Sequence, residues 1–102
     1  MVDKPFHWPG RRMSDPAHEM LVGFLVMDIQ RNSEWANELA AQINAVKSGR
    51  LPGWERIGNA YRLELTIKDA FLEDLVDAEI RVQRISLKEF SQAVDAWIKT
   101  LD

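Results

Sequence analysis

Cysteine is absent from the 102 residues of this chain. Its absence excludes a disulfide framework, a thiolate metal site and a cysteine nucleophile, and it fits a reducing compartment. Long apolar runs are missing as well: the longest extends from Met20 to Met27, far short of the roughly 20 residues that a membrane span requires. The first residues also lack the basic segment and apolar stretch of a signal peptide. We therefore expect a cytoplasmic protein with no membrane partner.

Residue patterns that carry catalytic chemistry are sparse. The two histidines are His7 and His18, and His18-Glu19 lacks the second histidine of a helical zinc motif. The serines have no nucleophile-elbow context, and Gly58, a glycine beside a predicted strand, belongs to no phosphate-cradling loop. We therefore expect no catalytic residue, no metal ligand and no cofactor in a protein that is not an enzyme.

Basic charge is in deficit, since the formal net charge is −3. Direct binding to nucleic acid draws on counterion release by Lys and Arg, so an acidic chain is a poor ligand for it. Acidity suits a basic partner or simply keeps a domain soluble. Trp54, Arg56 and Tyr61 form an aromatic and basic group that could stack on bases. The acidic balance instead favours core roles for Trp54 and Tyr61, with Arg56 paired to a nearby carboxylate.

The remaining composition is typical of one soluble globular domain, with 46% apolar and 28% charged residues. We expect residues 1–102 to share a single core, with a large contribution from the four tryptophans. Residues 1–16 hold three of the four prolines and are predicted to be irregular or extended. Phe6 and Trp8 in that segment are expected to be anchored in the fold.

Strand periodicity is clearest from Tyr61 to Lys68, where polar and apolar residues alternate. The apolar side consists of Tyr61, Leu63, Leu65 and Ile67. A second alternating stretch covers 77–83, and the two are predicted to pair antiparallel as a long hairpin. Residues 69–75 would then be a packed connection. A short strand over 54–57 is predicted to precede a turn at Gly58-Asn59.

Residues 19–30 are apolar on both faces, so periodicity alone does not distinguish a strand from a buried helix. Val22, Phe24 and Ile29 favour a strand. Pro16, preceded by Ser14 and Asp15, is equally suited to open a helix. We interpret the segment as a central strand buried on both sides.

Two amphipathic helices are expected. The first covers about 33–48, with an N-cap at Asn32-Ser33 and a stop at Gly49. Its predicted buried stripe begins at Trp35. The second follows Ser86-Leu87-Lys88-Glu89, a capping box in which the serine oxygen and the glutamate each satisfy a free backbone N–H. The order of elements predicts an α+β fold in which an antiparallel β-sheet has two α-helices packed on one face.

Acidic residues gather around the predicted hairpin connection. They are Asp69, Glu73, Asp74, Asp77 and Glu79. A pair of carboxylates could serve hydrolysis, but nothing in the sequence places them in a pocket, and such a run is usually a solvated face. The hypothesis carried forward is that these five residues bind a basic partner.

Scattered positions over most of the chain resemble the YacL-like family of small bacterial proteins. The positions are Lys47-Ser48-Gly49 through Trp54-x-Arg56-x-Gly58-x-x-Tyr61-x-Leu63, Glu89-Phe90 with Val94, and Arg12-Met13-Ser14 with His18-Glu19. The segment between the predicted hairpin strands is shorter than in that family.

The family has no established enzymatic activity, so the resemblance transfers no catalytic residue. The chain is similar in particular to YacL-like immunity proteins (the CdiI type) of contact-dependent growth-inhibition systems. That resemblance implies a cytoplasmic bacterial protein that binds a cognate toxin domain, often a basic nuclease, and blocks its active site. The alternative is a YacL-like housekeeping protein without a toxin partner. The oligomeric state is left open.

Overall fold

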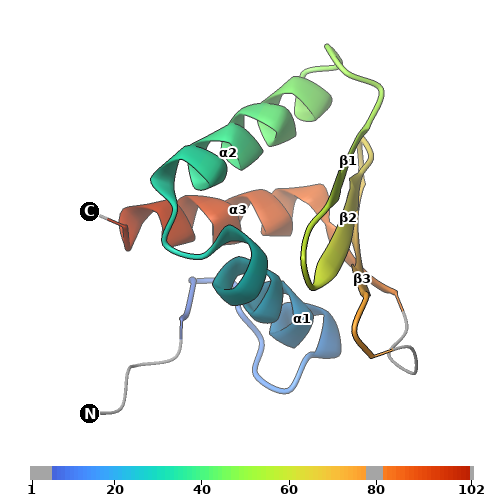
Figure 1. The fold of residues 1–102 in the computed structure, drawn as a ribbon. Coiled ribbons are helices and arrows are strands. Elements are labelled where there is room, and N and C mark those ends of the chain that lie inside the picture. The colour runs from blue at the N-terminus through green and yellow to red at the C-terminus, as the bar shows by residue number, and fades with distance from the viewer. Residues whose placement is uncertain (1–5, 78–81, 102) are drawn as a thin grey trace.

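The computed structural model describes residues 6–77 and 82–101. Its elements are α1 (Pro16–Phe24), the π-helical η1 (Leu25–Ile29), α2 (Ser33–Lys47), β1 (Trp54–Ile57), β2 (Tyr61–Leu65), β3 (Asp69–Asp74), β4 (Gln83–Ser86) and α3 (Leu87–Lys99). The strands form one antiparallel sheet in the order β1-β2-β3-β4, and the helices gather on one side of it (Figure 1). The expected α+β class is confirmed, with three α-helices in place of the two predicted. Within the described ranges, no helix has the length and apolar character needed to cross a membrane.

The interpretation of residues 19–30 as a strand was wrong, because α1 and η1 occupy this segment. The side chain of Asp15 caps α1 by accepting the N–H groups of Ala17 and His18, and Pro16 provides the first helical residue. Burial follows helical spacing at Leu21, Phe24, Leu25, Asp28 and Ile29. The helix start at Asp15-Pro16 therefore outweighs the β-branched residues, whose strand preference depends on packing context.

The predicted hairpin between 61–68 and 77–83 was also wrong. Strand β2 pairs with β3, the segment expected to be a connection, and β3 pairs in turn with β4. A tight turn causes the difference: the Thr66 N–H donates to the Asp69 carbonyl at 2.8 Å, and the Thr66 hydroxyl accepts the Asp69 N–H at 3.1 Å. Ile67 consequently lies at the turn with 60% of its surface exposed, not on the buried side. Residues 78–81 of the predicted second strand lie outside the described residues.

The predictions for β1 and α2 are confirmed. Gly58 N–H donates to the Tyr61 carbonyl at 2.9 Å and closes the hairpin of β1 and β2. Helix α2 begins after Asn32, whose side chain accepts the Trp35 N–H. Trp35 itself was expected in the buried stripe, but it remains 43% exposed beside β1.

The core lies between the sheet and the helices. Leu63, Leu65 and Leu72 supply it from the sheet, and Phe24 and Phe90 from the helices. The N-terminal segment closes one end, as expected: Trp8 is buried, and Phe6 packs edge-on against Trp97 with ring centroids 5.0 Å apart. The helices therefore cover one face of the sheet, and no helix of residues 6–77 and 82–101 lies on the other face.

Candidate protein-binding face

One face of the sheet carries no helix in the described part of the chain (Figure 1). Strand alternation and register place side chains from all four strands on it. We call this set the open sheet face; it consists of Glu55, Ile57, Arg62, Glu64, Asp69, Phe71, Glu73 and Arg84. Four carboxylates against two guanidinium groups give it a net charge of −2. The face is therefore acidic, with two large apolar side chains among the charges.

Its centre is a cluster of three glutamates around Arg62. Glu55 and Glu64 lie directly opposite each other on β1 and β2, an arrangement that is unfavourable for like charges. Arg62 forms an ion pair with Glu55. Its Nη2 lies 3.7 Å from a Glu64 oxygen, and its Nη1 lies 4.0 Å from a Glu73 oxygen. One cation thus bridges three strands and leaves two carboxylate charges uncompensated. Because these side chains are partly exposed, the pairs add little stability, and the charge stays accessible to a partner.

Of the five predicted partner-binding residues, those that the structure describes do not all lie on one face of the sheet. Asp69 and Glu73 lie on the open sheet face. Asp74 lies opposite Tyr61 at the end of β3, and its carboxylate accepts the N–H groups of Val76 and Asp77 in the turn that follows. Glu79 lies outside the described residues. Strand pairing instead joins Glu73 to Glu55 and Glu64, which sequence reasoning missed because their proximity depends on the register.

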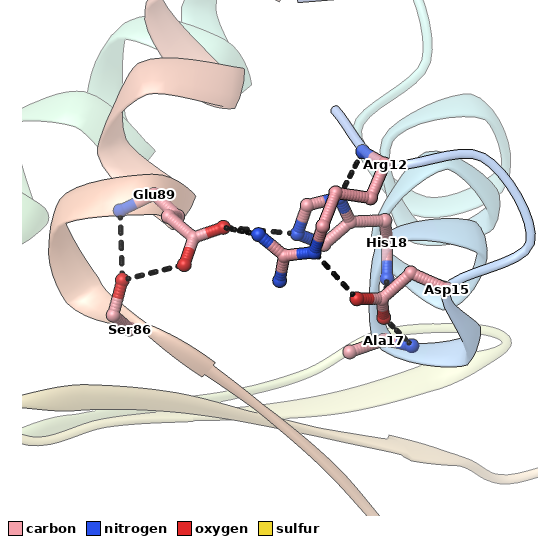
Figure 2. A network of polar contacts seen from close by, with 6 residues as sticks. All are labelled: Arg12, Asp15, Ala17, His18, Ser86 and Glu89. Carbon is pink, nitrogen blue, oxygen red and sulfur yellow. Dashed lines mark hydrogen bonds and ion pairs between the residues drawn. The ribbon is translucent and has the colours of Figure 1, made fainter. Parts of the chain in front are cut away.

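A second polar cluster joins the N-terminal segment, α1 and α3 (Figure 2). The His18 ring is fully buried; its Nδ1 accepts the Arg12 backbone N–H at 2.9 Å, and its Nε2 donates to Glu89 Oε2 at 3.0 Å. The Arg12 side chain lies between Asp15, at 3.1 Å, and Glu89, at 3.4 Å. Burial by itself raises the pKa of Asp15, but the backbone N–H of His18, the Arg12 side chain and the Ala17 N–H together lower it.

The arrangement in this cluster suits structural cohesion. The Ser86 hydroxyl caps α3 by accepting the Glu89 N–H at 3.1 Å and donates to Glu89 Oε1 at 3.3 Å. It therefore contacts the carboxylate and not the His18 imidazole, which is the group that activates the serine in a Ser-His-Asp triad. Both His18 nitrogens already have partners. The serine half of the predicted capping box is confirmed, while the Glu89 carboxylate turns to His18 and Arg12. Among the described residues, no group of three metal-ligating side chains could hold a metal ion.

A buried carboxylate that sequence reasoning missed attaches η1 to the sheet. Asp28 accepts the N–H groups of Ala60 and Tyr61, each at 3.0 Å, and lies 3.8 Å from Arg56 Nη1. A side chain at Gly58 would overlap the Asp28 carboxylate and the Arg56 guanidinium, so the glycine is needed for this approach. Burial, followed by the carboxylates of Asp74 and Asp28, raises the pKa of the Tyr61 phenol. The signal in the sequence was a carboxylate between Met27, the end of the longest apolar run, and Ile29, since a charge buried among apolar residues must find partners.

Beside this attachment, a cleft of about 180 Å³ opens between α2 and β1. We call it the α2–β1 cleft; it is lined by Trp35, Glu38, Leu39, Trp54 and Arg56. The Arg56 guanidinium lies over the Trp35 ring at 5.9 Å from its centroid. Of the aromatic and basic group considered in the sequence, Tyr61 is buried and Arg56 pairs with Asp28. The interpretation of Tyr61 as a core residue and Arg56 as a local ion-pair partner is confirmed, while Trp54 is only half-buried.

The resemblance to YacL-like proteins remains a prediction. Comparison of the chain with protein-family models, with curated proteins and with solved structures gave no match.

Proposed function

We propose that this protein is an immunity-type inhibitor that binds a basic toxin domain through its open sheet face and acts without a catalytic step of its own. The observation that carries the proposal is the uncovered, acidic sheet face, on which Glu55, Glu64 and Glu73 surround a single arginine. The resemblance to YacL-like immunity proteins supplies the biological setting. In that setting the protein works in the cytoplasm, where an incoming toxin must be neutralised.

The proposed binding mechanism separates into association and retention. A face with a net charge of −2 attracts a basic domain before contact, and such steering raises association rates by about 10- to 1,000-fold at low ionic strength. Retention then depends on apolar contact at the centre of the interface. Ile57, which is 68% exposed, and the half-buried Phe71 supply that contact between the charged side chains.

The regular sheet suits this task because its backbone is already ordered. Residues on a paired strand lose little freedom when a partner arrives, so less of the interaction energy is spent on ordering. Arg62 also holds the glutamates in place before binding, and a basic side chain of the toxin can share these carboxylates with it. Asp69 lies on the same face, while Asp74 and Asp77 follow at the end of β3.

The test uses the toxin domain that the proposed function places in a gene next to that of this chain, and it measures association by surface plasmon resonance at low and physiological salt. The variant Glu55→Gln/Glu64→Gln/Glu73→Gln removes the central carboxylates. A matched control, Glu19→Gln/Glu34→Gln/Asp95→Asn, makes the same change in net charge at exposed helix positions. We expect the first variant to lower the association rate roughly tenfold and to weaken its salt dependence, with little change in the control.

Equal rates for the two variants would exclude the open sheet face as the binding surface. Protection of growing cells from the toxin provides the functional readout, and it should decrease in the order of the measured affinities. Absence of binding by the unmodified protein would favour the alternative, a YacL-like housekeeping protein without a toxin partner.

A further inference from the structure

The α2–β1 cleft has features of a binding site that the open sheet face does not contain. Two indole rings border it, from Trp35 at the start of α2 and Trp54 at the start of β1. Pockets for drug-sized ligands measure about 300–1,000 Å³, whereas this cleft measures about 180 Å³. Its size therefore suits a single side chain of a partner protein.

The charge balance in the cleft favours a cation. Arg56 forms an ion pair with the fully buried Asp28 carboxylate, with Nη1 3.8 Å from Oδ2, and its Nη2 donates to the Asp28 carbonyl at 3.4 Å. Glu38 is exposed on α2, and no basic side chain within residues 6–77 and 82–101 forms an ion pair with it. Arg56, Asp28 and Glu38 together have a net charge of −1, and the unpaired negative charge is that of Glu38 at the cleft.

We propose that the α2–β1 cleft receives an arginine side chain of the partner protein, stacked on the indoles of Trp35 and Trp54 and paired with Glu38. A guanidinium group is planar, stacks on aromatic faces and binds carboxylates through two parallel hydrogen bonds. The cation is attracted to the indole faces as well. Arg56 over the Trp35 ring is an example of this contact within the chain itself.

The cleft and the open sheet face meet at strand β1, the edge strand that borders both. Trp54 also lines a shallow depression that includes Glu55 and Glu64, two of the central glutamates. A single basic partner can thus contact the glutamates with one part of its surface and place an arginine around the edge of β1. The assignment of the toxin as the source of this arginine rests on the proposed function. It gives the toxin one residue that anchors it to the cleft.

The cleft can be tested without the toxin, with N-acetyl-arginine amide as the probe and N-acetyl-citrulline amide as its uncharged isostere. The four tryptophan indole N–H signals are followed by NMR at constant ionic strength. Trp8 and Trp97 serve as internal references, since Trp8 is buried and the Trp97 indole donates to the Gln30 carbonyl. We expect the arginine probe to shift the Trp35 and Trp54 signals with a dissociation constant in the millimolar range, and citrulline to shift neither.

Glu38→Gln should weaken arginine binding several-fold, whereas Asp95→Asn, at an exposed position of α3, should leave it unchanged. Equal shifts at all four indoles, equal shifts with citrulline, or binding unaffected by Glu38→Gln would overturn the proposal. With the toxin domain, Trp35→Ala should raise the dissociation rate at least tenfold and leave the association rate nearly constant. If the arginine probe binds to the cleft but no toxin binds to the protein, the cleft is supported and the proposed function fails. If open-face substitutions slow toxin association but Trp35→Ala leaves the dissociation rate unchanged, the proposed function is supported and the cleft is not a contact of the toxin.

Discussion

Replacement of Asp28 tests the reasoning about the buried attachment between η1 and the sheet. The Asp28 side chain is fully buried and accepts two backbone N–H groups, from Ala60 and Tyr61. In Asp28→Ala both donors lose their acceptor, and each unsatisfied buried group costs about 1–3 kcal/mol. Arg56 also loses its counter-charge, but its side chain is 24% exposed and can turn toward water. We expect the free energy of unfolding to fall by about 3–5 kcal/mol.

A loss of this size is a large part of the roughly 5–15 kcal/mol that stabilises a typical domain. Urea unfolding monitored by circular dichroism measures it, and hydrogen exchange at the Ala60 and Tyr61 amides locates it. Asp28→Asn keeps one acceptor oxygen and should lose about 2 kcal/mol. Asp95→Asn, at an exposed position, should stay within about 0.5 kcal/mol of the unmodified protein. A loss below about 1 kcal/mol in Asp28→Ala would refute the assignment of Asp28 as an essential buried acceptor.

Two further predictions concern helix α1. A methyl group at Gly23 would lie 2.5 Å from the Tyr61 hydroxyl oxygen, so Gly23→Ala should cost about 1–3 kcal/mol through overpacking. The same change in a Tyr61→Phe background, which lacks that oxygen and leaves the ring carbon Cζ at 3.3 Å, should cost much less, and an equal cost in both backgrounds would exclude the clash. Because the pKa of Asp15 is lower in the folded protein than in the unfolded chain, the ionised carboxylate stabilises the fold. This contribution is fully present above the ordinary carboxyl pKa and is lost as the pH falls through the lower folded-state pKa. Asp15→Asn should therefore flatten the decline in unfolding free energy below about pH 4, and an unchanged slope would remove Asp15 from the acid response.

Elements with complete local signals were predictable from the sequence. Helix α2 and helix α3 each begin at a side chain that accepts a backbone N–H, Asn32 and Ser86, and these caps are visible within a few residues. The segment 19–30 had the same kind of signal at Asp15 and Pro16. The strand interpretation relied on the apolar residues on both faces of the segment, a pattern that fits a buried helix equally well.

Strand pairing was harder to predict because alternation shows which side a residue faces and not which strand lies beside it. The turn at Thr66 to Asp69 ends β2 early and makes β3 its partner. Asp69 and Glu73 therefore indicated from the sequence that the candidate site is acidic. The sequence did not indicate which other residues lie beside them. Glu55 and Glu64 come together with Glu73 only through the register of three strands.

The two sides of the sheet divide the chain into positions that answer to different constraints. Leu63 and Leu65 are locked into the interior, while Arg62 and Glu64, one step along the same strand, face outward. The outward residues can therefore change during evolution, and with them the binding specificity of this surface, while the core residues stay the same. Because outward and inward residues alternate along each strand, substitutions at the outward positions change this surface without an inserted loop and without a change in the core.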